Sequence, residues 1–478
     1  MSAKVLVIGG GPAGSIAATL LARGGAQVKL LEREFFPRYH IGESVSPSCR
    51  SIIDLAGAHE KIEARGYTVK QGILLRWGAE RDWTVDWPGR FGGAVRSWQV
   101  DRADFDQVLL THAGTQGVEV VQGAQVKAVT FGGDRATGAR WVQDGRRHDA
   151  AFDYVVDASG RAGVLCAQHF RNRQAHDVFR NVAIWSYYRG GSLLPGTPGG
   201  GINVISSPEG WYWVIPLKDD VYSVGFVTHK TRFAERKPAY PHLEAMFGDL
   251  VAESETVAGL VRDGQQAGPV RVEQDFSYAA PSYCGPGYFI AGDAACFLDP
   301  LLSTGVHLAM YSGMLAATSI LAAGHGDVSE LDARGFYESL YRNAYARLFS
   351  MVSGFYQQYR GQASYFWLAQ RLARGQHGGG SGIGSAFAAI TAGLADLHDA
   401  GRPGGTEPLH ELAAAATDAG LRAGSGVAAA TSTLAPMKMD ANDLYDAATG
   451  LYLVTSPRLG IRRADLPAAA STGAALAG

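Results

Sequence analysis

The sequence predicts an α/β fold: a doubly wound nucleotide-binding unit, an inserted antiparallel sheet and a mainly helical C-terminal region. Three observations lead to this fold class. The first 32 residues read as a strand, a glycine-rich turn, a helix and a second strand, which is how a doubly wound sheet opens. Residues 182–228 are rich in aromatic and β-branched side chains interrupted by turn residues, a pattern typical of antiparallel strands. Helical periodicity dominates from residue 306 onward.

The first turn carries a phosphate-binding pattern. Gly9, Gly11 and Gly14 have the GxGxxG spacing between a strand and a helix, which is the context that the pattern requires. Gly9 permits the tight turn, Gly11 lets backbone approach a pyrophosphate, and Gly14 lets the helix lie close to the strand. The helix N-terminus offers N–H groups to the phosphates. Glu32, about twenty residues on, is placed to accept hydrogen bonds from a ribose. The unit is therefore predicted to bind a dinucleotide.

The loop after the second strand is expected to approach the same ligand. It contains Arg38, which would contact the pyrophosphate, and Glu43, which would face the active-site side. A solvated surface position is the alternative for Arg38. The loop leads into a helix predicted at 47–55.

Alternation, caps and turn residues predict the elements that follow. Lys70 lies at the start of a strand predicted at 69–78, and Asp101 is expected to cap a helix. A buried strand ends in Asp157, and the small residues up to Gly160 are a second expected contact for the nucleotide. The other predicted elements are strands at 4–8, 27–31, 118–121, 125–131, 138–143, 153–157 and 451–454, and helices at 242–260, 306–323, 330–359, 363–373, 386–399 and 407–421.

These elements group into three regions. The nucleotide-binding domain is predicted to be discontinuous, at 1–180 and 270–330, with an antiparallel-sheet, substrate-side domain at 181–269. Residues 331–478 form the mainly helical C-terminal region, with a Gly-rich connector at 376–385 and a disordered tail.

The composition argues against several classes of protein. The 43 Lys and Arg nearly balance the 45 Asp and Glu, so neither a nucleic-acid partner nor a membrane surface is expected. The four cysteines form no CxxC pair, so no metal site or disulfide framework is expected, and a reducing, cytoplasmic location fits. No secretion signal is visible, and the apolar region 288–323 is interrupted by Asp293, Asp299 and His307, so no membrane span is expected.

Several motifs together resemble the FAD-dependent monooxygenase-like flavoproteins, whose FAD-binding Rossmann-type domain is glutathione-reductase-like. They are the glycine turn with Glu32, the segment from Gln99 through Arg102 to Phe105, and the Gly292-Asp293 pair. The resemblance implies that Asp293 binds the ribityl chain and that Arg102 lies by the pyrophosphate and ribityl side. The residues it assigns to FAD are Gly9, Gly11, Pro12, Ala13, Gly14, Glu32, Arg33, Arg38, Ser44, Arg102, Asp157, Gly160, Asp293, Pro300, Gly305 and Val306.

Two further features look like the flavin-dependent halogenases. WYWVIP at 211–216 fits the WxWxIP signature of that family, and Lys70 stands where the family has its essential lysine. Ser303, Thr304 and Gly305 resemble its flavin- and halide-binding loop. The Gly-Glu-Ser spelling at 42–44 and the Ala-rich C-terminal region look more like the branch that acts on phenols, pyrroles or carrier-tethered substrates than the free-tryptophan branch.

The resemblance implies a halogenation in secondary metabolism, such as antibiotic biosynthesis. Reduced FAD (FADH2) and O2 would oxidise chloride or bromide, held by the Ser303 loop, to hypohalous acid. The oxidant would then pass to Lys70, either as a hydrogen-bond donor or as an amine that forms a chloramine. Glu43 would remove the proton from the ring or orient Lys70. A solvated strand lysine is the alternative for Lys70.

Aromatic residues are expected to separate the flavin from the substrate. Trp211 and Trp213 are two apart in a predicted strand, so they share a face, and packing in the sheet core is the alternative for both. The residues assigned to this barrier and the substrate side are Trp211, Trp213, Ile215, Pro216, Phe349 and Tyr356. His307 is expected to be structural, and Asp275 is a weak candidate for covalent flavin attachment.

The partners follow from the same reasoning. No second complete GxGxxG unit is visible for NAD(P)H, so a separate NAD(P)H-dependent flavin reductase is expected to supply reduced FAD. The acceptor is expected to be a small aromatic or a carrier-protein-tethered substrate. The alternatives are an FAD-dependent aromatic hydroxylase, and a geranylgeranyl-reductase-like enzyme of similar fold.

Overall fold

The computed structural model describes residues 2–78, 82–357, 444–446 and 448–464. A six-stranded sheet forms the centre of the nucleotide-binding domain, and β1 lies within it, parallel to β11 on one side and to β2 on the other. The strands stand in the order β18 (Cys284–Gly285), β19 (Tyr288–Ile290), β11 (Tyr154–Asp157), β1 (Lys4–Ile8), β2 (Gln27–Leu31) and β7 (Glu119–Val121). The predicted Rossmann-type order of strand, turn, helix and strand is confirmed.

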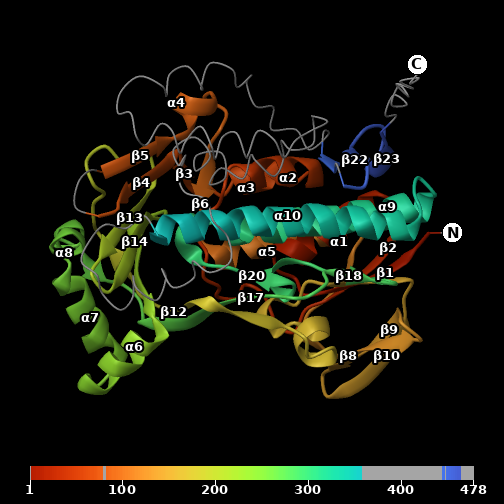
Figure 1. Cartoon of the computed structure of the whole chain (residues 1–478), viewed down its shortest axis with the longest axis horizontal. Coiled ribbons are helices and arrows are strands. Elements are labelled where there is room, and N and C mark those ends of the chain that lie inside the picture. Colours follow the sequence, from red (N-terminus) through yellow and green to blue (C-terminus); the bar gives the residue numbers. More distant parts are fainter. Residues whose placement is uncertain (1, 79–81, 358–443, 447, 465–478) are drawn as a thin grey trace, which may run out of the picture.

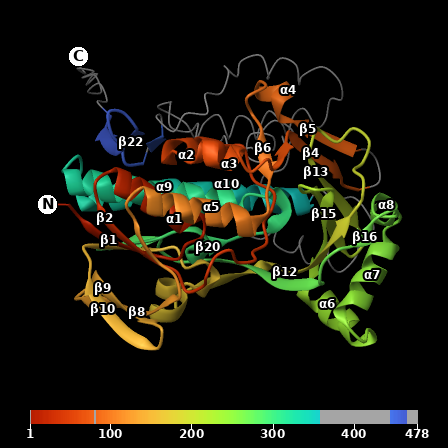
Figure 2. The ribbon, with the colours of Figure 1, turned by 180° about the vertical axis from the view of Figure 1, so that it is seen from behind.

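Long helices pack beside this sheet (Figures 1 and 2). They are α1 (Pro12–Arg23), α5 (Arg102–Thr115), α9 (Gly305–His325) and α10 (Glu330–Gln357). A Cβ at Gly313 would lie 2.3 Å from the carbonyl oxygen of Ala13, so glycine allows α9 to approach α1 this closely. By length and composition α9 could span a membrane, with a mean hydropathy of 1.4, but 89% of that stretch is buried inside the protein. Its apolar side chains therefore pack in the core.

The second large sheet has nine strands and reaches from the middle of the molecule to its left end in Figure 1. Its order is β20 (Cys296–Phe297), β17 (Arg271–Ala279), β12 (Gln174–Arg189), β15 (Val221–His229), β14 (Gly210–Pro216), β13 (Ile202–Ser207), β4 (Gly72–Arg76) and β5 (Asp82–Asp86), with β16 (Gln265–Gln266) also paired to β12. The region predicted at 181–269 contains only the middle of this sheet, because β4, β5 and β17 come from outside it. Those strands satisfy edges that the insert would otherwise leave open.

The two faces of this sheet enter different cores. Trp211 and Trp213 pack with the nucleotide-binding domain, whereas Tyr212 and Val214 pack beneath the helices of the outer layer. That layer consists of α6 (Lys230–Arg236), α7 (Leu243–Glu253) and α8 (Glu255–Leu260). The single helix predicted at 242–260 is divided at Ser254, whose backbone is extended and whose side chain caps α8.

The strand predicted at 69–78 is also divided. Gln71 interrupts it, because its N–H bonds the carbonyl oxygen of Gly199 and its own carbonyl oxygen accepts from Trp87. Lys70 therefore ends the short strand β3 (Thr68–Lys70), which pairs with β6 (Ser97–Gln99) outside the large sheet.

The remaining elements are smaller. They are α2 (Ser48–Ala56), α3 (His59–Glu63), α4 (Trp87–Phe91), the hairpin sheet β8 (Ala124–Gly132), β9 (Arg135–Gln143) and β10 (Arg146–Ala151), and the sheet β21 (Tyr445–Asp446), β22 (Leu451–Val454) and β23 (Gly460–Arg463). β10 was not predicted, because its sequence RRHDAA has no buried apolar stripe. The helices predicted at 363–373, 386–399 and 407–421, the connector at 376–385 and the tail lie outside the described residues.

Candidate active site

The glycine turn between β1 and α1 is built for close backbone contacts. Gly9 has φ +102, and a Cβ there would lie 2.3 Å from the carbonyl oxygen of Ala158. A Cβ on Gly14 would lie 1.9 Å from the carbonyl oxygen of Gly9. Gly11 stands at the N-cap of α1 and has no capping side chain, and a Cβ there would meet only a guanidinium nitrogen of Arg38, at 3.4 Å. The turn thus presents backbone and a helix N-terminus to an anion.

Glu32, the acidic residue after β2, stabilises this turn through hydrogen bonds. Glu32 is buried, and its two carboxylate oxygens accept the backbone N–H of Gly10 at 2.6 Å and of Glu34 at 2.8 Å. Arg33 is exposed and pairs with Glu34. Glu32 is therefore fixed beside the turn, where the sequence predicted its contact with a ribose.

Two arginines beside the turn share one carboxylate. Arg102 donates to both oxygens of Asp106, each at 2.9 Å, and Arg38 lies 3.1 Å from the same group. Arg102 also donates to the carbonyl oxygen of Ile41 at 2.7 Å, which ties α5 to the loop after β2. The two guanidinium groups therefore lie beside the turn, where they can donate to a pyrophosphate. Asp106, four residues after Arg102, was missed by the sequence reasoning although its spacing was a usable signal.

The two predicted aspartates have different surroundings. Asp157 is fully buried, and its carboxylate accepts the N–H groups of Ser159 at 3.1 Å and Leu165 at 2.7 Å, so it fixes the loop that carries Gly160. Burial raises the pKa of Asp293, whereas the charge of Arg161, Arg102 and Arg173 lowers it.

The loop before α9 has the backbone shape of an anion site. Ser303 is left-handed with φ +57, and its carbonyl oxygen accepts the Ser46 hydroxyl at 3.3 Å. Thr304 is the N-cap of α9 but makes no side-chain cap, so the N–H groups of the first turn and the positive dipole end face outward from the helix. Gly305 has open space where a Cβ would stand. Asp299, before Pro300, accepts the N–H of Leu301 at 2.9 Å and closes the loop.

Lys70 lies on a shared polar face. It stands opposite Ser97 in the β3–β6 pair, and Ser44 bridges to Gln99 from the other edge of β6. Residues opposite each other, or two apart in a strand, point to the same side. The side chains of Lys70, Ser97, Gln99 and Ser44 therefore share one face, although they come from three separate segments.

The polar atoms of this face are buried and unsatisfied. Ser44 Oγ, Lys70 Nζ, Ser97 Oγ and Gln99 Oε1 have no hydrogen-bond partner among the residues that the structure describes. Buried polar atoms are normally paired. Four such atoms on one face suit the binding of a small polar ligand.

The surroundings of Lys70 favour its neutral form. The side chain is fully buried, and burial lowers its pKa to about 7, with Cys49 acting in the opposite direction. Its Nζ lies 4.9 Å from the ring centroid of Trp87, which is also fully buried. A solvated strand lysine, the alternative for this position, is therefore excluded.

Glu43 faces another set of groups. It accepts the Tyr187 hydroxyl at 2.7 Å, and burial raises its pKa while Tyr187, Ser223 and Arg102 lower it. Within the described ranges no hydrogen bond or ion pair joins Glu43 to Lys70, so the predicted orienting contact is not made.

Trp211 and Trp213 form an aromatic wall. Their ring centroids are 6.1 Å apart, and both indoles point into the core that the nucleotide-binding domain shares with this sheet. Ile215 shares that face, and Pro216 ends β14. Gly225 lies opposite Trp213, and a Cβ there would stand 2.1 Å from the indole, so the wall depends on a glycine in the neighbouring strand.

Tyr356 connects the wall to the loop before α9. It accepts the indole N–H of Trp211 at 2.9 Å and donates to Asp299 at 3.1 Å. The rings of Phe349 and Tyr356 both contact the Phe179 ring, at centroid distances of 5.6 and 5.4 Å. The predicted aromatic face of α10 is thus packed against this part of the sheet.

Two further predictions concern neighbouring residues. His307 is fully buried and hydrogen-bonds the Ser48 hydroxyl through Nδ1 at 2.7 Å, the structural contact expected of it. The Asp275 side chain lies outside the described residues.

Sequence reasoning did not find several residues around the site. Ser97 could have been found, since it is two positions from Gln99 in the same strand. Trp87, Tyr39 and Tyr187 left no local signal. Tyr187 meets Glu43 across 144 positions of the chain, a distance that no short pattern spans.

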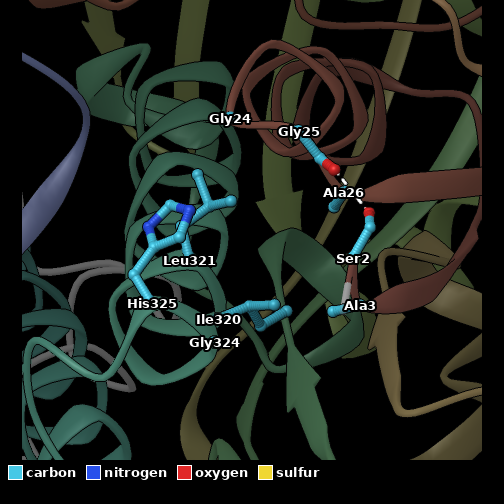
Figure 3. Close-up of a pocket in the computed structure, with 9 residues that line it drawn as sticks. All are labelled: Ser2, Ala3, Gly24, Gly25, Ala26, Ile320, Leu321, Gly324 and His325. Atoms are coloured by element: carbon cyan, nitrogen blue, oxygen red, sulfur yellow. Dashed lines mark hydrogen bonds between the residues drawn. The ribbon is translucent and has the colours of Figure 1, made fainter.

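A separate small hollow lies at the other end of α9 (Figure 3). It is lined by Ser2, Ala3, Gly24, Gly25, Ala26, Ile320, Leu321, Gly324 and His325. The length of α9 separates it from the Ser303 loop by about 30 Å. It contains none of the predicted site residues.

Known proteins are similar to this chain in sequence and in fold. The family model described as tryptophan halogenase matches residues 4–96 and 90–378. Tryptophan 2-halogenase of Chondromyces crocatus is 40% identical over 422 residues, covering 86% of this chain and 80% of the relative. The flavin-dependent halogenase armH3 of Armillaria mellea is 37% identical over 387 residues, covering 76% of each.

Solved structures agree. The flavin-dependent halogenase CmlS has a TM-score of 0.73 and 34% identity, covering 77% of this chain and 68% of its own. The myxobacterial chondrochloren halogenase CndH has a TM-score of 0.73 and 32% identity, covering 82% and 90%. The glycine turn, the arginines Arg38 and Arg102 and the half-buried Asp293 fit FAD, and the family resemblance drawn from the sequence is confirmed. The chain therefore belongs to the flavin-dependent halogenases, and it is an oxidoreductase with a Rossmann-type FAD domain that uses reduced FAD, O2 and halide.

Proposed function

We propose that Lys70 captures hypohalous acid made at the flavin and delivers the halogen to an electron-rich aromatic acceptor. The observation that carries this proposal is the fully buried Nζ of Lys70, which has no hydrogen-bond partner among the described residues and shares a face with three other unsatisfied polar atoms. A charged ammonium in such surroundings is costly, so burial favours an amine with a free lone pair.

The bound flavin would supply the oxidation of halide, which no side chain can perform. The chain would hold its pyrophosphate at Gly11 with Arg38 and Arg102, and its ribityl chain at Asp293. Halide would bind in the loop of Ser303, Thr304 and Gly305 at the N–H groups of Thr304 and Gly305, where the α9 dipole favours an anion, because the Ser303 N–H already bonds the carbonyl oxygen of Pro300. Two predicted contacts, Asp157 and Gly160, would shape the backbone rather than touch the cofactor through a side chain, because the Asp157 carboxylate is engaged by its own loop.

Capture and transfer at Lys70 balance without another reagent. The amine and hypohalous acid give an N-halogenated lysine and water. The aromatic carbon then takes the halogen, the ring loses its proton, and the lysine amine is restored. The wall of Trp211, Trp213 and Ile215 would keep the acceptor from the flavin while a small oxidant passes, which excludes competing oxygen transfer.

The acceptor is proposed to be a phenol, a pyrrole or a carrier-tethered aromatic. A relative in Aspergillus terreus, 36% identical over 385 residues, is a sulochrin halogenase, which supports an acceptor other than tryptophan. The name of the Chondromyces crocatus relative makes tryptophan the second candidate. Phe349 and Tyr356 pack near the wall, and we propose that they form the boundary of the acceptor site on the α10 side.

A test uses the full chain with FAD, a flavin reductase, chloride or bromide, and a panel of phenols, pyrroles and tryptophan. Mass spectrometry detects the halogen isotope pattern. We expect a phenolic or pyrrolic product; halogenation of tryptophan alone would replace the acceptor assignment.

Lys70→Ala tests the capture step. We expect the variant to bind FAD and to release hypohalous acid to a soluble trap, while halogenated product falls by about a hundredfold or more, as removal of an essential group does. Lys61→Ala, a partly exposed lysine that contacts His112 and Thr115, is the matched control. Normal product formation by Lys70→Ala would rule out the capture role.

A further inference from the structure

A row of hydrogen-bonded groups joins the surface to the buried Glu43. Tyr39, in the loop after β2, is 40% exposed, whereas Glu43 is 3% exposed. The hydroxyl oxygens of Tyr39 and Tyr187 are 2.8 Å apart, and Tyr187 donates to Glu43 at 2.7 Å. Solvent is thus connected to the carboxyl by direct contacts between side chains.

The protonation state of Glu43 determines the direction of the hydrogen bonds between the members of this row. The indole N–H of Trp185 donates to Tyr39 at 2.7 Å; an indole cannot accept, and each phenol has a single proton to donate. When Glu43 is ionised, Tyr187 must donate to it and Tyr39 must donate to Tyr187. When Glu43 is protonated, the row can run the other way, with the Tyr39 proton turned to solvent. The two arrangements differ by one proton on Glu43.

The inner end of the row lies between the wall and the flavin-side residues. Ser223 contacts Glu43 and accepts the indole N–H of Trp213 at 3.1 Å. The charge of Arg102 acts on both Glu43 and Asp293.

Burial keeps the phenols neutral. It is the main cause of the raised pKa of both Tyr39 and Tyr187, and the charge of Glu43 raises both further. Arg271 of β17 lies over the Tyr39 ring at 3.6 Å, and its charge acts in the opposite direction by lowering the pKa of Tyr39. Burial also raises the pKa of Glu43. Glu43 is therefore the member of the row that changes charge.

The reaction of this family consumes a proton inside the protein. Reduced FAD, O2, halide and one proton give FAD, hypohalous acid and water, so each turnover needs a proton on the flavin side of the wall. We propose that Tyr39, Tyr187 and Glu43 form a relay that carries this proton from solvent. Glu43 gives its proton inward, Tyr187 replaces it, Tyr39 reprotonates Tyr187, and water reprotonates Tyr39. The relay requires the family reaction and is independent of Lys70.

The first measurement uses the flavin-free protein. Infrared difference spectroscopy after a pH jump follows the carboxyl band that is lost in Glu43→Gln. We expect this band to change about tenfold or more slowly in Tyr187→Phe than in the wild type, because loss of a proton donor slows proton transfer by at least that factor. A merely structural hydrogen bond would move the pKa of Glu43 without delaying its protonation.

The second measurement is a single turnover of the holoenzyme, with hypohalous acid collected by a soluble trap. We expect Tyr187→Phe and Tyr39→Phe to slow trap halogenation about tenfold, with a larger slowing in D2O than the wild type shows. Tyr188→Phe is the matched control, since Tyr188 is the next residue of β12 and packs in the second core. Its rates should equal those of the wild type.

The outcomes separate the two proposals. Equal pH-jump kinetics in Tyr187→Phe and the wild type, or a lag without any change in the trapping rate, would overturn the relay. A variant that loses the aromatic product but keeps normal trapping would be defective in the Lys70 step and not in the relay. The trap measures hypohalous acid before it reaches Lys70.

Discussion

At the scale of single residues, the site depends on a lysine whose ordinary charge is disfavoured. Lys70 is fully buried above Trp87, and its pKa falls to about 7. A pKa this far below the ordinary value of 10.5 makes the folded state bind its proton more weakly than the unfolded chain. Stability is therefore lost as pH falls from about 10.5 to 7, and it is regained as pH rises. Under the proposed capture role, the cost has a function, because the neutral amine is a nucleophile near pH 7.

Replacing Lys70 by methionine should remove that pH dependence. Between pH 7 and 9 the wild type should gain about 2 kcal/mol relative to Lys70→Met, as its lysine discharges. Urea unfolding at the two pH values measures the difference. A constant gap between the two proteins would mean that the lysine is charged across the whole range.

Gly11→Val should remove flavin binding and leave the fold intact. A Cβ at this position meets only the flexible end of Arg38, so the protein without ligand tolerates it, but the side chain would occupy the space that the pyrophosphate needs. An overpacking cost of about 1–3 kcal/mol weakens binding by roughly ten- to hundredfold. Flavin content after gel filtration, with circular dichroism as the folding check, tests this; full flavin occupancy would contradict the role of Gly11.

At the scale of elements, the position of the tryptophans on β14 depends on the neighbouring strand β15. Alternate residues of this strand enter two cores, and the tryptophan face meets the nucleotide-binding domain. The indole of Trp213 lies over Gly225 of β15. The wall is therefore a property of two paired strands and not of the WxWxIP pattern alone.

Gly225→Ala should displace Trp213 and destabilise the sheet by about 1–3 kcal/mol, because a methyl group would stand inside the indole. Urea unfolding measures the loss, and the near-ultraviolet circular dichroism of the tryptophans reports the displacement. Gly248→Ala is the control: nothing lies within 4 Å of its added Cβ in α7, so it should stabilise by up to about 1 kcal/mol. Equal spectra and stability for Gly225→Ala and the wild type would show that Trp213 does not depend on this glycine.

At the scale of the whole molecule, the site is assembled where three parts of the chain meet. The nucleotide-binding domain supplies the glycine turn and the Ser303 loop, the β3–β6 pair supplies Lys70, and the nine-stranded sheet supplies the wall. Tyr356 of α10 joins the wall to the Ser303 loop through its hydrogen bonds with Trp211 and Asp299. Halide oxidation and acceptor binding are thus proposed to lie on opposite sides of the wall formed by Trp211 and Trp213.

The purified protein should not oxidise NADPH by itself, because the sequence contains only one GxGxxG unit and FAD would occupy it. Absorbance of NADPH, with and without an added flavin reductase, tests this. Rapid consumption by the halogenase alone would require a nicotinamide site that the sequence reasoning missed.

The sequence by itself determined the parts that depend on neighbours along the chain. The glycine turn, the cap at Asp101, the tryptophan alternation and the family were readable because turns, caps and strand faces are set by spacings of a few residues. Tertiary structure alone decided which distant side chains share a surface. The buried face of Lys70 joins segments near residues 44, 70 and 98, and Tyr39 reaches Tyr187 across 148 positions. Burial shifts a pKa and orients a proton only after the chain has folded, so those properties appear in no local pattern.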